Sequence, residues 1–92
     1  MTVEVRDPQG ERLNGVVLTA KSLDRDDVLL QDTARTVDGN AEVKVLTLHQ
    51  FSIGAQLRGY VPVTLGPTYP AWQQHLSVVM NRPDNRRFVP IQ

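Results

Sequence analysis

Short runs in which apolar and polar residues alternate constrain this chain more than any other feature of its sequence. In residues 2–6, TVEVR, Val3 and Val5 share one face and the polar residues share the other. This period of two is typical of a half-buried β-strand, because successive side chains of a strand point to opposite faces. Residues 51–57 repeat the pattern and place four apolar side chains on one face: Phe51, Ile53, Ala55 and Leu57.

Turn signals separate these runs at intervals of about 8–12 residues, as in small all-β domains. The strongest is Asp38-Gly39, because glycine takes positive φ without steric cost and Asp-Gly is favoured in tight hairpins. Further breaks fall at Asp7-Pro8, Gly10, Asn14-Gly15 and Gly59-Tyr60. We expect strands at residues 2–6, 15–23, 31–37, 41–46, 51–57, 61–65 and 75–80.

The alternation also predicts which side chains face the core. In two of the expected strands the inward residues are Val16, Leu18, Ala20, Val43 and Val45. Pro62 cannot donate a backbone hydrogen bond, so the run at residues 61–65 should be an edge strand or the start of one. The polar residues 24–27, DRDD, are expected to form a loop longer than the minimum.

Seven short strands without an amphipathic helix predict an all-β fold. We expect a seven-stranded antiparallel Greek-key β-sandwich of Ig-like type, with an eighth strand if the C-terminal tail adds one. The sandwich should occupy residues 1–82. Residues 83–92 would form a C-terminal extension, either an ordered strand or a flexible tail.

Composition excludes several classes of function. The 92 residues suit one domain, and ten basic and ten acidic residues give a formal net charge of zero, without the basic excess typical of nucleic-acid binding. The absence of cysteine excludes disulfides, zinc thiolate sites and thiol catalysis. The sequence shows no signal-peptide core and no transmembrane run. The sequence leaves the compartment open between a cytoplasmic protein and one exported as part of a larger assembly.

The order of these elements resembles the carboxypeptidase regulatory-like domains of the transthyretin-like (prealbumin-like) β-sandwich group. The resemblance rests on VRDPQGERLNGVVL, then TVDGNAEV, then HQFSIGAQLRGY, and it covers roughly residues 2–80. Two departures stand out. His49-Gln50 replaces the family's Pro-Gly before the aromatic strand, and Ala41-Glu42 stands where an aromatic residue usually follows Asp-Gly-x. The resemblance implies a transthyretin-like sandwich.

The same group includes an enzyme family, the 5-hydroxyisourate hydrolases, whose signature this chain lacks. Glu4 lies roughly where that family carries a histidine, and the C-terminus reads NRRFVPIQ rather than ending in Tyr-Arg-Gly-Ser. His49 and His75 could serve in acid–base catalysis because histidine titrates near neutral pH. Neither belongs to a recognisable triad or metal-ligand spacing, so we favour surface roles and expect no catalytic residue, cofactor or metal.

Candidate partner-binding residues lie near the C-terminus. Tyr69 and Trp72 could contact a protein or stack on a sugar ring, because both side chains combine apolar area with a polar group. The tail could pair with another chain's sheet edge through Arg86, Arg87, Phe88, Val89 and Ile91. The carboxylates of residues 24–27 could attract calcium, but the loop lacks a glycine, and we favour a solvated loop.

These observations favour a non-enzymatic accessory or adaptor domain that binds another protein or a neighbouring domain of a longer chain. The resemblance implies settings beside peptidases, in surface or secreted proteins, and on bacterial secretion spikes, where such domains help to load effectors. A carbohydrate-binding module using Tyr69 and Trp72 is the main alternative. A divergent 5-hydroxyisourate hydrolase is a weaker one. No nucleic-acid partner and no membrane insertion are expected.

Overall fold

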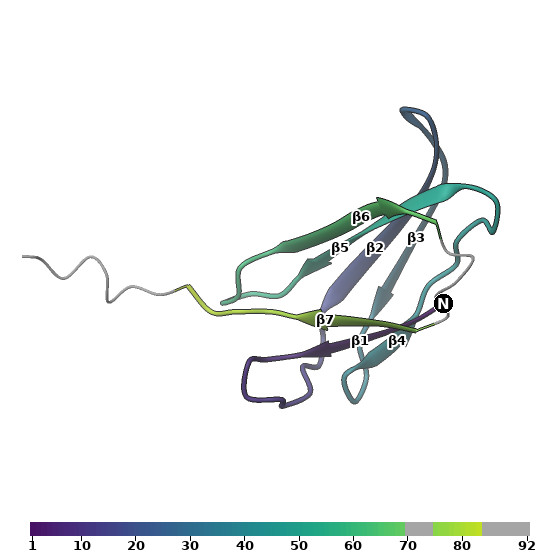
Figure 1. Cartoon of the computed structure of the whole chain (residues 1–92). Coiled ribbons are helices and arrows are strands. Elements are labelled where there is room, and N and C mark those ends of the chain that lie inside the picture. Colours follow the sequence, from purple (N-terminus) through teal and green to yellow (C-terminus); the bar gives the residue numbers. More distant parts are fainter. Residues whose placement is uncertain (70–74, 84–92) are drawn as a thin grey trace, which may run out of the picture.

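The computed structural model describes residues 1–69 and 75–83. These residues form strands joined by turns and loops, with no helix (Figure 1). The part of the chain described therefore contains no helix that is long and apolar enough to cross a membrane. The strands are β1 (Thr2–Arg6), β2 (Val17–Asp24), β3 (Asp27–Arg35), β4 (Asn40–Glu42), β5 (Gln50–Gln56), β6 (Val63–Thr68) and β7 (His75–Val79).

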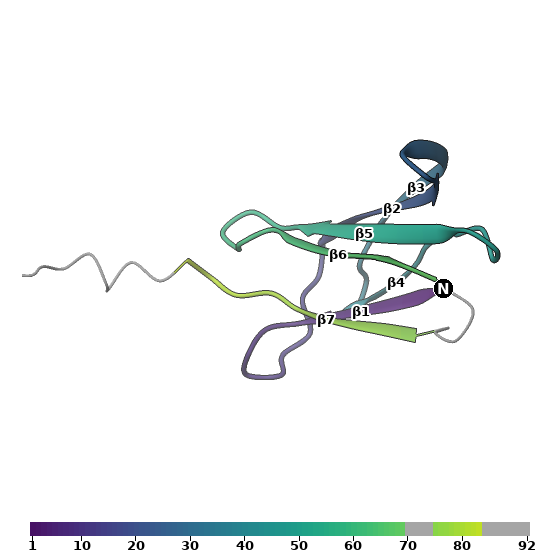
Figure 2. The ribbon, with the colours of Figure 1, turned by 45° about the horizontal axis from the view of Figure 1, so that its top comes forward.

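The seven strands form two sheets that lie face to face (Figure 2). The small sheet has the order β4-β1-β7, and the large sheet has the order β3-β2-β5-β6. All three pairs in the large sheet are antiparallel, and β4 also runs antiparallel to β1. The all-β fold with seven strands in two layers is the architecture that the alternating pattern predicts.

One strand pair contradicts the expectation of a wholly antiparallel fold. β1 and β7 are parallel, with Thr2 opposite His75 and Arg6 opposite Val79. Alternation identifies a strand and its buried face, but it carries no information about the direction of a partner far away in the chain. Parallel neighbours need a long crossover connection, and here the whole large sheet lies between β1 and β7 in the sequence.

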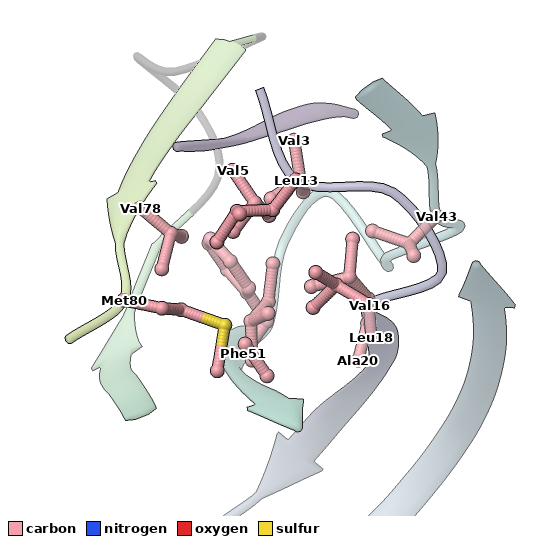
Figure 3. Packing of buried hydrophobic residues seen from close by; sticks show 12 residues of the cluster. Val3, Val5, Leu13, Val16, Leu18, Ala20, Val43, Phe51, Val78 and Met80 are labelled. Carbon is pink, nitrogen blue, oxygen red and sulfur yellow. The ribbon is translucent and has the colours of Figure 1, made fainter. Parts of the chain in front are cut away.

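The hydrophobic core lies between the sheets and contains most of the residues predicted to face inward (Figure 3). Val3 and Val5 from the small sheet pack in one cluster with Leu18 and Phe51 from the large sheet. Val45 and Leu57 are only partly buried, although both pack against this cluster. The other buried members are Leu13, Val16, Ala20, Val43, Ile53, Ala55, Val78 and Met80.

The Asp38-Gly39 turn is confirmed, but it joins the two sheets instead of two neighbouring strands. Both residues have positive φ, 58° and 80°, as a two-residue type I′ turn requires. Val37 and Asn40 exchange backbone hydrogen bonds of 2.8 and 3.1 Å across it. The strands on either side, β3 and β4, belong to different sheets. The turn therefore carries the chain from one layer to the other.

The expected strand at residues 41–46 is shorter than predicted, because β4 ends at Glu42. Beyond it, two backbone N–H groups donate to side chains rather than to a neighbouring strand. The N–H of Lys44 donates to Asp32 Oδ2 at 2.8 Å, and that of Leu46 donates to Ser22 Oγ at 2.9 Å. Since Asp32 lies on β3 and Ser22 on β2, these two hydrogen bonds hold the segment against the large sheet.

Two further predictions about the large sheet need correction. The strand expected at 31–37 begins at Asp27, because VLL continues the ladder without alternating. The DRDD segment is a two-residue turn rather than a long loop, since Asp24 pairs with Asp27 and Arg25 takes a φ of 55°. The expectation that the run after Pro62 would be an edge strand is confirmed, because β6 lies at an edge of the large sheet.

Candidate functional site

The free edge of β3 is the longest strand edge of the described fold. The two sheets have four edge strands, namely β3 and β6 in the large sheet and β4 and β7 in the small one. β3 has nine residues, whereas β4 has three and β7 five. β6 is interrupted by Gly66, whose φ is 93°, and by Pro67, which has no N–H to donate. The segment after β4 contacts β3 through the side chain of Asp32, and within the described residues it forms no hydrogen bond with the β3 backbone. β3 is therefore the edge best suited to pairing with another strand.

None of the nine side chains of β3 is buried. Val28 and Leu29 retain 51% and 48% of their accessible surface. They lie next to the β2–β3 turn, which projects beyond the neighbouring strands in Figure 1. The register shifts beside them, since Ser22 pairs with Leu30 but Leu23 pairs with Val28. Such a bulge bends an edge and leaves the stretch from Gln31 to Arg35 as the regular part of the ladder.

The outer face of the large sheet carries a polar hollow with a volume of about 300 Å³. We call it the sheet hollow. Gly54 lies at its middle, with Thr19 on β2 and Thr64 on β6 directly opposite. The lining consists of Thr19, Lys21, Gln31, Ser52, Gly54, Gln56 and Thr64. Apart from one lysine and the glycine, these side chains end in hydroxyl or amide groups, which form hydrogen bonds without carrying charge.

A second hollow, of about 390 Å³, lies among loops at one end of the sandwich. The guanidinium of Arg82 stacks 5.3 Å from the centre of the Tyr60 ring. Its Nη2 also lies 3.4 Å from the Tyr60 hydroxyl, a hydrogen bond that raises the pKa of Arg82. On the other side, Asp7 Oδ1 accepts the N–H groups of Gln9 and Glu11. Arg82 and Asp7 thus already have partners within the fold.

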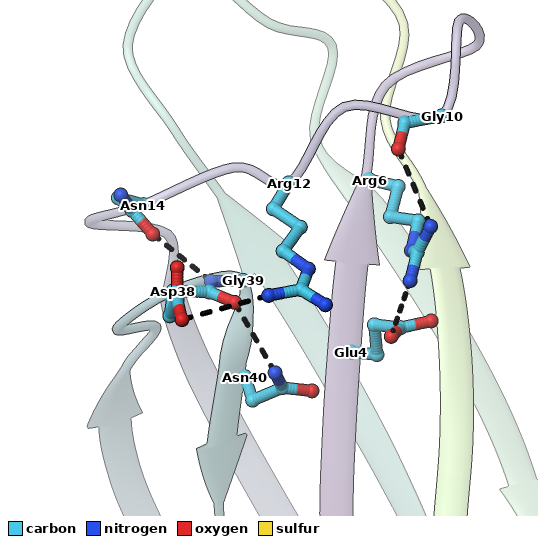
Figure 4. Close-up of polar contacts among 8 residues, drawn as sticks. All are labelled: Glu4, Arg6, Gly10, Arg12, Asn14, Asp38, Gly39 and Asn40. Atoms are coloured by element: carbon cyan, nitrogen blue, oxygen red, sulfur yellow. Dashed lines mark hydrogen bonds and ion pairs between the residues drawn. The ribbon is translucent and has the colours of Figure 1, made fainter.

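Polar contacts at the end of β1 tie neighbouring loops together (Figure 4). Arg6 donates to Glu4 Oε2 at 2.9 Å and to the carbonyl of Gly10 at 3.3 Å. The hydrogen bond from Arg6 holds the pKa of the Glu4 carboxyl below its ordinary value. Nearby, Asn14 Oδ1 accepts the N–H of Gly39 at 2.9 Å. This network stabilises the loops around the Asp38-Gly39 turn. Arg6 uses its two Nη atoms in these contacts, whereas its buried Nε has no hydrogen-bond partner among the described residues.

Of the partner-binding residues predicted from the sequence, Tyr69 is the one within the described part of the chain. It follows β6 and is 54% exposed, as a contact residue requires, but it does not line either hollow. The others lie outside the described residues: Trp72, Arg86, Arg87, Phe88, Val89 and Ile91. Their role, and that of a separate extension at residues 83–92, stays a prediction.

The two histidines occupy unrelated positions. His49 lies in the turn before β5, where its N–H approaches the carbonyl of Leu46 at 3.4 Å, while His75 is the first residue of β7. Within residues 1–69 and 75–83, no three His, Asp or Glu side chains converge to hold a metal ion. Tyr60, which follows the break at Gly59, is partly buried and packs against the core.

Three comparisons with known proteins found no match to this chain. Neither a protein-family model, nor a curated protein, nor a solved structure matches this chain. Function therefore has to be argued from the molecule's own surfaces.

The β3 edge and the sheet hollow were not predicted from the sequence. The hollow does have one signal in the sequence, because Gly54 interrupts an otherwise alternating strand without an adjacent turn signal.

Proposed function

We propose that this chain is a non-enzymatic accessory domain of the transthyretin-like, carboxypeptidase regulatory-like class, with Greek-key connections. Its role is to bind an extended segment of another protein, or of a neighbouring domain in a longer chain. The observation that carries this proposal is the β3 edge: a nine-residue strand with no buried side chain and with Val28 and Leu29 half-exposed.

An edge strand presents a row of backbone N–H and C=O groups that a partner strand can pair with. On β3 the regular stretch from Gln31 to Arg35 would supply these hydrogen bonds. Val28 and Leu29, beyond the bulge, would add apolar contact, because burying either side chain removes hydrocarbon surface from water. The partner is therefore expected to be an extended segment with an apolar residue that meets Val28 and Leu29.

The sequence resemblance supports the same kind of role. Domains of the resembled class act beside peptidases, in surface proteins and on bacterial secretion spikes. The surface predicted from the sequence, Tyr69 with Trp72 and the tail from residue 83, is a second candidate for the contact. The two surfaces can be separated by experiment because they share no residue.

The test begins with the full chain as bait in an extract of the native host, with mass spectrometry of the captured proteins. Purified partner is then titrated calorimetrically against wild type and against Val28→Gln/Leu29→Gln. We expect the double variant to bind at least about tenfold more weakly, since buried apolar anchors dominate such interfaces. Val79→Gln is the matched control, because Val79 is a similarly exposed strand residue (53%) in the other sheet.

Two outcomes decide between the surfaces. If Trp72→Ala or removal of residues 83–92 weakens binding while the β3 variant binds normally, the contact belongs to the C-terminal surface and the β3 assignment is wrong. If all of these variants bind like wild type, neither surface is the interface.

A further inference from the structure

Gly54 is a glycine whose backbone conformation does not require glycine. The other five glycines all have positive φ, which side chains rarely tolerate: Gly10, Gly15, Gly39, Gly59 and Gly66. A Cβ added at Gly54 would meet no atom within 4 Å, so neighbouring atoms do not exclude one. Glycine inside a strand costs stability because it loses more conformational freedom on folding. A glycine inside a strand often marks a bulge or a place where a ligand or another backbone approaches closely. The bulge in the β5–β6 pair lies between Phe51 and Ile53 and does not include Gly54, which leaves close approach of a ligand as the interpretation we pursue.

The position of Gly54 makes that interpretation specific. It lies on β5, an inner strand of the large sheet, and on the outer face, between Thr19 and Thr64. Without a side chain it forms the floor of the sheet hollow, with hydroxyl and amide side chains around it. Each of these groups can donate and accept hydrogen bonds, which suits a ligand dense in hydroxyl groups.

The charges on this face are of one sign. Cross-strand pairing arranges its side chains in three rows: Gln31-Lys21-Ser52, then Thr33-Thr19-Gly54-Thr64, then Arg35-Val17-Gln56. Lys21 and Arg35 lie in the outer rows, and none of the three rows contains an acidic residue. Since alternate residues on a strand are about 7 Å apart, the two cations are separated by roughly 13 Å along the strands.

We propose that the outer face of the large sheet binds a carboxylate-bearing oligosaccharide. One sugar unit lies over Gly54 with its hydroxyl groups bonded to the lining, and Lys21 and Arg35 pair with carboxylates on either side. This site goes beyond the protein contact proposed above, because it uses the face of the sheet and not the β3 edge. Either proposal can fail without affecting the other.

Other occupants fit this face less well. A second copy of the same face would bring Lys21 and Arg35 against positive charges and would bury few apolar side chains. A nucleic acid strand is normally held by aromatic side chains on which bases stack, and the three rows contain none. An acidic peptide would use the two cations but would leave most of the hydroxyl and amide lining without a matching partner.

The experiment measures binding of short uronic-acid oligosaccharides to the full chain. Oligogalacturonate, oligoalginate and hyaluronan fragments are titrated calorimetrically, and amide shifts are followed by NMR. We expect at least one to bind and to shift the amides around Gly54, with affinity falling as salt is added. A neutral galactan of matched length should bind at least about tenfold more weakly, because the ion pairs are lost. Polyglutamate should also bind more weakly.

Gly54→Val is the decisive variant. A Cβ at this position meets no atom within 4 Å, and the methyl groups of valine would occupy the hollow. Because valine is also favoured in strands, we expect this variant to melt no lower than wild type and yet to lose the oligosaccharide. Lys21→Ala should weaken binding about tenfold or more, as expected when a charged partner is removed. The control Lys44→Ala removes an exposed lysine elsewhere and should bind normally.

The proposal is overturned if none of the three uronic-acid ligands binds at millimolar concentration, or if Gly54→Val binds as well as wild type. Equal affinity for neutral galactan would remove the role of the carboxylates. Equal affinity for polyglutamate would make the face a site for acidic peptides instead.

Discussion

At the scale of single residues, Thr36 joins two loops through one hydroxyl group. Its side chain is buried, donates to the carbonyl of Leu13 at 2.7 Å and accepts the N–H of Val16 at 3.0 Å. Both partners precede β2, whereas Thr36 follows β3. The alternation of the sequence predicted Val16 as a core residue, but it could not identify Thr36, because a polar residue in a strand pattern is normally assigned to the solvent face.

Thr36→Val keeps the shape of the side chain and removes the hydroxyl. We expect the free energy of unfolding to fall by about 1–3 kcal/mol, because a carbonyl and an N–H group lose their partner away from water. Thr33→Val is the control, since Thr33 is exposed on β3, and its effect should stay within about 0.5 kcal/mol. Urea denaturation of the three proteins measures both values. Equal stability of the two variants would show that the Thr36 hydroxyl is not stabilising.

At the scale of elements, the centre of the large sheet was predictable and its periphery was not. The alternation in β2 and β5 identified their buried faces, because each strand has one face toward the core and one toward solvent. The start of β3 was missed because VLL has no alternation, and the end of β4 because Asp32 and Ser22 supply acceptors that replace a neighbouring strand. Side-chain acceptors of this kind leave no periodic signal in the sequence.

Two strand glycines should respond oppositely to alanine. Gly66 on β6 has positive φ, and a Cβ there would lie 2.6 Å from the carbonyl oxygen of Phe51. Gly66→Ala should therefore lower the free energy of unfolding by about 1–3 kcal/mol. Gly54→Ala meets no obstacle and should raise it by about 0.5–1 kcal/mol. Thermal and urea unfolding of both variants provide the check. A destabilising Gly54→Ala would mean that Gly54 serves the fold rather than a ligand.

At the scale of the whole molecule, the acid sensitivity of folding should depend partly on the Glu4–Arg6 pair. The pKa of Glu4 is lowered in the folded protein, first through the hydrogen bond from Arg6. A carboxyl whose pKa is lower when folded stabilises the fold above its unfolded pKa, and this contribution is lost as the pH falls through the folded value. The unfolded state then binds the proton more readily, so acid favours unfolding.

Glu4→Gln should remove this part of the pH dependence. Urea unfolding measured from about pH 7 down to about pH 3 should show wild type losing more stability than Glu4→Gln, with the difference between them shrinking in acid. Arg6→Gln removes the hydrogen-bond donor and should reduce the loss of stability in acid in the same way. The double variant should show little further change in the pH dependence beyond either single variant. Identical pH curves for wild type and both single variants would contradict the assignment.

The surfaces were harder to predict than the fold for a physical reason. One face of a strand buries apolar side chains away from water, and this gives the sequence an apolar–polar alternation with a period of two. A binding face instead depends on which strands become neighbours in the sheet. Lys21 and Arg35 share a face because the bulge between Ser22 and Leu23 shifts the pairing of β2 with β3 by one residue. Alternation and the turn would otherwise set the register, and the extra residue of a bulge leaves no periodic signal in the sequence. Tyr69 was chosen by residue type alone; it is exposed, and its role in binding stays a prediction.

The parallel pairing of β1 with β7 also determines how this domain would carry tension. Because the two strands point the same way, Thr2 lies at one end of the small sheet and Val79 at the other. A pull applied through these two positions slides the strands past each other along their length. The hydrogen bonds between them are then loaded together rather than broken one after another, as they would be in a hairpin opened from its free end. If the domain were pulled from both ends within a longer chain, the β1–β7 hydrogen bonds would resist the force in shear.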